Sequence, residues 1–240
     1  MAPKLSQNKF RINEQNISYY NEIADSYDNI LDQKDSNKII RQKIAKKFCD
    51  IVEGGNVLDF GGGTGLDLEW LVNKGYSVFF CEPSSGMREK AVNYNKNFLH
   101  NNSIIFLDDN RTDFTQWNKQ LPFPSKVDAV LANFAVINNI ADIALLFNAL
   151  SLVSKPGAHF IALILDNDFK KTLRSRLYRN IRSFIFRKPF SFQIQHKENR
   201  QTVFIYTIKE IKRASAGFFD FCSHEFLYQS GFSLIHLIRK

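Results

Sequence analysis

The chain has few residues of the kinds that hold a disulfide framework or a metal. Its three cysteines, Cys49, Cys81 and Cys222, form an odd set at long, irregular intervals, which is typical neither of paired disulfides nor of a zinc site. Its five histidines include no H-x-x-x-H pair, so the sequence gives no support for a structural or catalytic metal. We therefore expect no metal, and we expect Cys81 to be a small buried apolar residue.

Long apolar segments are also missing. No apolar run approaches the roughly 20 residues that a membrane-spanning helix needs. Residues 1–10 are polar and lack the continuous apolar stretch of a secretion signal. These absences predict a cytoplasmic protein. The 240 residues are enough to bury one sizeable core in one or two domains.

A glycine-rich turn directly after an apolar strand is the most informative feature of the sequence. Residues 57–65 read V-L-D-F-G-G-G-T-G, and Asp59 stands two residues before Gly61, the first glycine. Together with Gly63 and Gly65, this glycine lets the main chain bend tightly and approach a ligand closely. A strand, a glycine turn and a helix predict a nucleotide-cofactor pocket at the carboxyl end of a parallel strand. The third glycine comes two positions after the second, and not three, which disfavours a dinucleotide.

An acid also follows the next predicted strand. Residues 76–81 predict a second buried strand that ends at Glu82, where a carboxylate can accept hydrogen bonds from both hydroxyls of a ribose. The alternative for Glu82 is a solvated acid that caps a helix starting near Ser84 or Ser85. Residues 103–107 and 127–134 predict a third and a fourth strand, and residues 159–165 a fifth.

These segments resemble the motifs of the class I S-adenosylmethionine-dependent methyltransferases. The glycine turn is similar to the family's D/E-x-G-x-G-x-G motif, and residues 82–87, E-P-S-S-G-M, are similar to its second motif. Residues 154–158, S-K-P-G-A, are similar to an L-K-P-G-G turn before the fifth strand. Upstream, residues 20–28 resemble the F-D-x-x-A-x-x-Y-D segment of many small-molecule members. The motifs keep their order from residue 20 to residue 165.

The resemblance implies an α/β fold, a Rossmann-like three-layer sandwich. Its seven-stranded, mostly parallel sheet would close with an antiparallel C-terminal hairpin, for which residues 217–221 and 232–238 are the candidates. Strands and helices alternate at βαβ spacing, in agreement with such a sheet. We expect N-terminal lid or docking helices over residues 1–35, with Ala24 and Tyr27 on one helix face. The methyltransferase domain would span residues 36–240.

The resemblance also implies a cofactor, S-adenosyl-L-methionine, and a set of residues that bind it. Asp59 would help to hold the amino group, the glycines would border the methionine and ribose, and Glu82 would take the ribose hydroxyls. Asn133 and Phe134 would border the methyl group and the acceptor, while Tyr27 either covers the cofactor or only packs. The predicted cofactor-binding residues are Tyr27, Asp59, Gly61, Gly63, Gly65, Glu82, Asp109, Asn110, Asn133 and Phe134.

Two assignments in this set stay open. Asp109 and Asn110 match the adenine position best, but Asp108 is a rival, and Asp113 fills the position or caps a turn. No catalytic residue is assigned, because the histidines and tyrosines of the late segments carry no specific signal for a general base. No acceptor atom can be read from these residues.

The region after residue 165 differs in charge. Residues 169–197 contain nine lysines or arginines and no acid, which accounts for essentially all of the net charge of +8. Apolar residues recur there at helical spacing, so we expect a basic amphipathic helix and treat 169–206 as a basic helical insertion near the substrate side. For residues 169–188, a solvated helix face, an acidic ligand and a peripheral membrane contact remain open. Nucleic acid is disfavoured, because a charge patch without base-reading elements is weak evidence.

The predicted function is methyl transfer to an oxygen, nitrogen or carbon nucleophile of a small molecule. Residues 132–135 lack the prolines of amino-methylating DNA enzymes, and no cysteine follows a proline as in cytosine C5 enzymes. The 23 phenylalanines favour an aromatic or lipid-like acceptor. The alternative is a non-catalytic module that binds S-adenosylmethionine or a protein partner, and the oligomeric state is left open.

Overall fold

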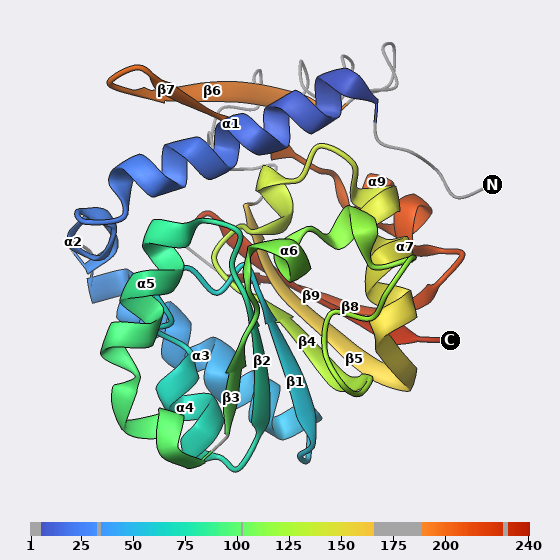
Figure 1. The fold of residues 1–240 in the computed structure, drawn as a ribbon. Helices are drawn as coiled ribbons and strands as arrows, with labels where there is room; N and C mark the ends of the chain where they lie inside the picture. Colours follow the sequence, from blue (N-terminus) through green and yellow to red (C-terminus); the bar gives the residue numbers. More distant parts are fainter. Residues whose placement is uncertain (1–5, 33–34, 102, 166–188, 228–229) are drawn as a thin grey trace.

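The computed structural model describes residues 6–32, 35–101, 103–165, 189–227 and 230–240. A seven-stranded sheet has the order β3-β2-β1-β4-β5-β9-β8 (Figure 1). Its strands, in that order, are Ile104–Phe106, Ser77–Cys81, Asn56–Phe60, Val127–Ala132, Ser154–Leu165, Phe232–Arg239 and Phe219–Leu227. The first five strands are parallel, and β9 pairs antiparallel with both β5 and β8. The predicted Rossmann-like sheet with its antiparallel C-terminal hairpin is confirmed.

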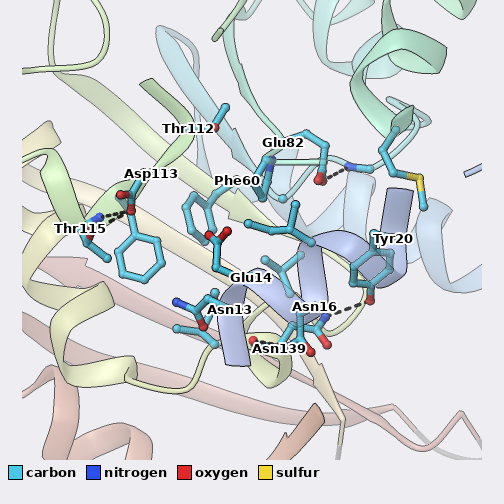
Figure 2. A pocket seen from close by; sticks show the side chains of 18 of the residues that line it. Asn13, Glu14, Asn16, Tyr20, Phe60, Glu82, Thr112, Asp113, Thr115 and Asn139 are labelled. Atoms are coloured by element: carbon cyan, nitrogen blue, oxygen red, sulfur yellow. Dashed lines mark hydrogen bonds between the residues drawn. The ribbon is translucent and has the colours of Figure 1, made fainter. Parts of the chain in front are cut away.

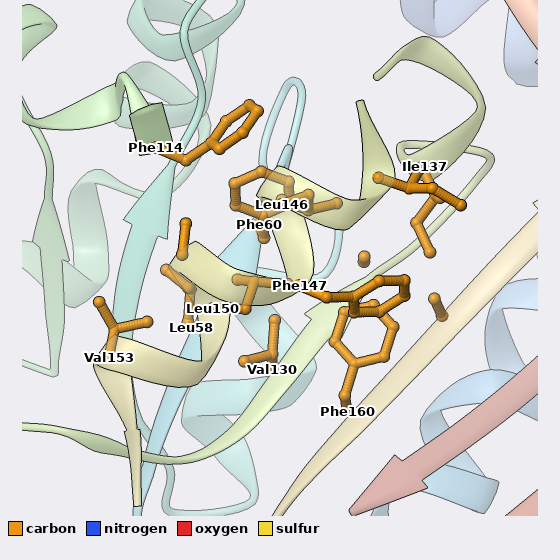
Figure 3. Close-up of a cluster of buried hydrophobic side chains, with 14 of the residues drawn as sticks. Leu58, Phe60, Phe114, Val130, Ile137, Leu146, Phe147, Leu150, Val153 and Phe160 are labelled. Atoms are coloured by element: carbon orange, nitrogen blue, oxygen red, sulfur yellow. The ribbon is translucent and has the colours of Figure 1, made fainter. Parts of the chain in front are cut away.

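Alternation along the strands divides the apolar core into two layers. Leu58 and Phe60 of β1 belong to one buried cluster, whereas Val57 belongs to the other. This is the period of two expected when both faces of a sheet are covered. The cluster that contains Leu58 is packed by α7, whose Phe147 and Leu150 lie against the sheet (Figure 3).

Helices lie on both faces of the sheet and so complete three layers (Figure 1). The helices α3, α4 and α5 carry apolar residues of one cluster, and α7 and α9 carry those of the other. Their bounds are α3 Asp35–Ile51, α4 Leu68–Asn73, α5 Ser85–Tyr94, α7 Ile143–Val153 and α9 Ile208–Ser215. Short helices connect the strands: η1 Lys96–Asn101, α6 Asp109–Thr112, η2 Phe114–Gln116 and η3 Ile137–Asn139.

A second layer of structure covers the carboxyl end of the sheet. The helix α1, Gln7–Ile23, crosses above the sheet beside a two-stranded ribbon of β6, Phe190–His196, and β7, Asn199–Ile205 (Figure 1). Asn16 on α1 joins the two: its Nδ2 donates to the Thr202 carbonyl at 3.0 Å and its Oδ1 accepts from Thr202 N–H at 2.7 Å. Asn16 Nδ2 also donates to the Asn139 carbonyl at 2.9 Å. This arrangement makes α1 a roof over the sheet.

Some sequence-based expectations need correction. We expected residues 169–206 to be helical, but residues 190–205 form the β6–β7 hairpin, in which apolar residues alternate at a period of two along β6 and form a continuous buried run at the end of β7. Residues 166–188, which include the expected amphipathic helix, lie outside the described residues. Ala24 and Tyr27 do not share a helix, since α1 ends at Ile23 and α2, Tyr27–Asp32, starts anew. None of the described helices is long and apolar enough to cross a membrane.

Candidate cofactor and acceptor site

A cavity of about 410 Å³ lies between the carboxyl ends of β1, β2 and β4 and the roof helix α1 (Figure 2). Seven of the ten predicted site residues line it: Tyr27, Gly61, Gly63, Glu82, Asp109, Asn133 and Phe134. Asp59, Gly65 and Asn110 are not in the lining. Segments that are far apart in the sequence therefore meet around one concave site.

The glycine turn folds as its composition requires. Gly61, Gly63 and Gly65 have φ values of +71°, +59° and +79°, a region that residues with a side chain rarely adopt. A Cβ atom at Gly61 would lie 2.4 Å from Val136 Cγ1, so that glycine also permits close packing. Gly65 differs from the others, because a Cβ there would lie 2.9 Å from Ala91 Cβ. It packs the turn against α5 and does not face the cavity.

Asp59 lies beneath this turn as a buried acid without a partner. It is 1% exposed, and neither carboxylate oxygen accepts a hydrogen bond from the described residues. Burial, and next the charge of Asp67, raise the pKa of Asp59 well above its usual range. An unpaired buried carboxylate is costly, and native structures that keep one usually have a functional reason. A cationic group near the turn would stabilise Asp59.

Glu82 is buried too, but its carboxylate is held by the main chain. Gly63 N–H donates to Oε2 at 3.0 Å and Ser84 N–H donates to Oε1 at 2.8 Å. Each oxygen retains a further lone pair, which can accept from a ligand hydroxyl. Burial raises the pKa of Glu82 to about 7, against the lowering effect of these two bonds. The helix cap itself is Ser84, whose Oγ accepts from Met87 N–H at 3.3 Å.

The acids after β3 take different positions. Asp109 begins α6, lines the cavity and forms an ion pair with Arg88. Asn110 is exposed and outside the lining, and Asp108 pairs with Arg111 at 3.1 Å. Asp113 lines the cavity and also caps a turn, since its Oδ1 accepts from Thr115 N–H at 3.0 Å. Both roles that we considered for Asp113 are thus compatible with its position.

A charged network beside the glycine turn was missed by the sequence analysis. A smaller cavity of about 30 Å³, between the turn and Phe134, is lined by Arg41, Asp67 and Asn133. Arg41 pairs with Asp67, and Asn133 Nδ2 donates to Asp67 Oδ2 at 3.0 Å. The Arg41 guanidinium lies 4.6 Å from the centre of the Phe134 ring. Asp67 directly follows the glycine motif and could have been flagged, but nothing near Arg41 in the sequence marks it.

Tyrosines of the N-terminal helices close one end of the cavity. Tyr20 and Tyr27 lie edge to face at 6.0 Å, and both line the cavity. Burial raises the pKa of both hydroxyls above their usual range. Next to Tyr27, Asp28 accepts from the Thr64 hydroxyl at 2.6 Å and so ties α2 to the glycine turn. The segment that resembled a lid motif does contact the predicted cofactor pocket.

The strand order, the glycine turn after β1 and the acid after β2 define a class I, Rossmann-like methyltransferase fold. Residues 23–217 match the family model described as a methyltransferase domain. Because that match spans more than half of the chain, the protein belongs to the methyltransferase-domain family. No curated protein matches the chain.

Solved structures share the same fold. An S-adenosylmethionine-dependent methyltransferase from Clostridium acetobutylicum is 16% identical, with a TM-score of 0.62 over 92% of this chain and 98% of that one. DhpI, solved with SAM and HEP, is 17% identical, with a TM-score of 0.67 over 99% and 100%. The 1,6-didemethyltoxoflavin-N1-methyltransferase of Burkholderia thailandensis, solved with 1,6-didemethyltoxoflavin and S-adenosylhomocysteine, is 10% identical, with a TM-score of 0.67 over 100% and 93%. At these identities the likeness concerns the fold.

Proposed function

We propose that the protein transfers the methyl group of S-adenosylmethionine to a small-molecule acceptor. The observation that carries this proposal is the pair of buried carboxylates around the glycine turn. Asp59 has no hydrogen-bond partner in the described part of the chain, and Glu82 keeps free lone pairs beside the Gly63 amide. A ligand with a cationic amino group and a ribose diol supplies what both acids lack. The residues present therefore fit this cofactor.

Each end of the cofactor would be held by a different group. Asp59, with the charged network of Arg41 and Asp67 next to it, would orient the amino acid end. Glu82 would accept from the ribose hydroxyls, and Asp109 or Asp113 would meet the adenine. The glycine turn would admit the sugar, because no side chain intervenes. Asn110 and Gly65 would contribute only indirectly, since neither lines the cavity. Asp59 does not line it either, so it would act on the amino group by its charge through the glycine turn and not by direct contact.

Methyl transfer requires little from the protein beyond binding and aligning the two reactants. The bound cofactor supplies a methyl group that is already activated by its positive sulfur. The chain's part is to exclude water and to hold the acceptor in line, which can account for about 7–11 kcal/mol of the barrier. The roof helix α1 and the tyrosines that close the cavity are suited to this role. The cavity of about 410 Å³ is of the size that small-molecule sites have.

The second candidate function is binding of S-adenosylmethionine without catalysis. The cavity extends from the predicted cofactor residues to Asn13, Glu14 and Ile17 of α1, which favours the enzyme. The test begins with the melting temperature of the purified chain, which S-adenosylhomocysteine should raise and NAD should not, because a ligand of the folded state stabilises it. Methyl transfer from labelled S-adenosylmethionine to phenols, carboxylic acids and amines then separates the enzyme from the module. If S-adenosylhomocysteine does not raise the melting temperature, both candidate functions are wrong.

A further inference from the structure

The acceptor end of the cavity has an apolar wall and a polar roof. The wall consists of aromatic and branched side chains from the ends of the strands and the loops after them, namely Phe60, Phe114, Val136 and Ile140. The roof consists of α1, from which Asn13, Glu14 and Ile17 face the cavity. Figure 2 shows Glu14 directed from α1 toward Phe60. An acceptor here would lie with a flat apolar body against the wall and its polar groups toward α1.

The charges around this space have one sign. The described residues that line the cavity include four with carboxyl groups, Glu14, Glu82, Asp109 and Asp113, and no lysine, arginine or histidine. Three of these acids already have partners: main-chain amides for Glu82, Arg88 for Asp109, and Thr115 for Asp113. Glu14 is exposed at the edge of the cavity and has no hydrogen-bond or ion-pair partner among the described residues, while Arg11 and Arg200 line a groove on its outer side. Glu14, the one acid that we place at the acceptor end, is therefore also the one of the four without a partner among the described residues.

A neighbouring hydrogen-bond acceptor, on Asn13, supports the same conclusion. Asn13 Oδ1 is buried and receives no hydrogen bond from the described residues. An asparagine side chain can present either its NH2 group or its carbonyl oxygen, whereas an ionised carboxylate only accepts hydrogen bonds. Glu14 therefore determines which ligand charge this end of the cavity favours. A bound carboxylate or phosphate would meet Glu14 as a like charge, which costs binding energy. A protonated amine would form an ion pair with Glu14 and could donate a further hydrogen bond to Asn13 Oδ1.

We propose that the acceptor is an aromatic or apolar amine, and that Glu14 and Asn13 select it. This inference rests on the proposed function and narrows its substrate class. It assigns the two α1 residues to specificity, and it makes no statement about which atom is methylated. The same roof helix that excludes water thus also distinguishes cationic from anionic small molecules.

Matched probes of opposite charge test the proposal. The full chain, saturated with S-adenosylhomocysteine, is titrated calorimetrically with 2-phenylethylamine against 3-phenylpropionate, and with tryptamine against indole-3-propionate. We expect each amine to bind more tightly than its carboxylate counterpart by about fivefold, the upper end of the effect of an exposed charge pair. Glu14→Gln should bring each ratio close to one. Asp50→Asn, which removes an exposed carboxylate on α3 outside the cavity, should leave both ratios unchanged.

The outcomes separate this inference from the proposed function. If S-adenosylhomocysteine fails to raise the melting temperature of the wild type, the cofactor assignment itself is wrong. If it binds but no amine binds, or the carboxylates bind as well as the amines, only the amine proposal is overturned. A ratio that Glu14→Gln leaves unchanged also overturns it, because the selectivity would then come from elsewhere. Loss of folding is detected by the melting temperature of Glu14→Gln without ligand.

Discussion

The two ends of the cavity are built in different ways. Much of the cofactor end comes from one stretch of chain, residues 59–87, in which main-chain geometry positions the polar groups: Glu82 is held by the amides of Gly63, in the turn after β1, and of Ser84. The acceptor end comes from α1 and from η2, η3 and their flanking residues, which follow α1 by about 100 positions in the sequence. One end depends on local backbone conformation and the other on how a helix docks. Substitutions should therefore affect the two ends separately.

The largest effect is expected at Glu82. Removing its carboxylate in Glu82→Ala should weaken S-adenosylhomocysteine binding about 100-fold, because hydrogen bonds to a charged group contribute about 1.5–3 kcal/mol each. Asp109 lies at the same end but its side chain is 76% exposed, so Asp109→Ala should cost only about threefold. Isothermal calorimetry measures both affinities. The comparison tests whether burial or mere proximity determines the contribution of each acid.

The control for Glu82→Ala is Glu89→Ala, which removes an exposed glutamate from the neighbouring helix α5. Its affinity should equal that of the wild type. Wild-type affinity in Glu82→Ala as well would mean that this acid does not contact the ribose. The cofactor would then have to be held by Asp59 and the charged network alone.

A smaller effect is expected where α1 docks. Asn16→Ala removes two buried hydrogen bonds to Thr202 and a partly buried one to Asn139, and it takes away the side chain that pairs with these main-chain groups. This should weaken docking by about 2 kcal/mol and speed amide hydrogen exchange in α1 roughly 30-fold. The KM for an acceptor should rise, whereas the affinity for S-adenosylhomocysteine should fall far less than in Glu82→Ala. Mass spectrometry of exchanged peptides and steady-state kinetics provide the two measurements.

Ser18→Ala serves as the matched change, because Ser18 is exposed on the same helix. It should alter neither exchange nor kinetics. Equal loss of cofactor and acceptor binding in Asn16→Ala would contradict the separation of the two ends. It would indicate that the roof supports the glycine turn as much as the acceptor space.

The same division explains how much could be predicted from the sequence. The turn at Gly61, the acid at Glu82 and the parallel sheet follow from short-range rules, since backbone strain and strand alternation leave local marks. The sequence around Arg41 and Asn16 contains no such local signal, because the roles of these residues arise from contacts with residues more than 20 positions away. The β6–β7 hairpin was predicted as helical, because the basic charge and apolar spacing upstream were extended across residue 189.

Within the predicted site the local rules also had limits. Asn110 follows the third strand in the expected order, yet the helix α6 begins at Asp109 and directs Asn110 away from the cavity lining. Gly65 matches the motif, but its contact is with α5. Position in a motif thus predicted which segment reaches the site, and the local helix geometry decided which side chains face it.

The smallest effect, and the most specific, is the pH dependence of cofactor binding. The pKa of Glu82 is raised to about 7 in the free protein, so below that pH the carboxyl is protonated and accepts fewer hydrogen bonds. Ribose hydroxyls stabilise the charged form, so binding should release a proton. The affinity for S-adenosylhomocysteine should therefore fall as pH drops below 7, by at most about tenfold per pH unit. Calorimetry at pH 6 and 8, in buffers of different ionisation enthalpy, measures the affinity and the proton release.

The stability of the free protein should respond in the opposite direction. A carboxyl whose pKa is raised on folding binds more protons in the folded state, so the free energy of unfolding falls as pH rises from 4.5 to about 7. Asp59, whose pKa burial also raises, adds to this slope. Glu82→Gln separates the two acids, because it should remove the part of the pH dependence that belongs to Glu82. A full pH dependence of binding in Glu82→Gln would assign the released proton to Asp59, and hence to the amino group and not to the ribose.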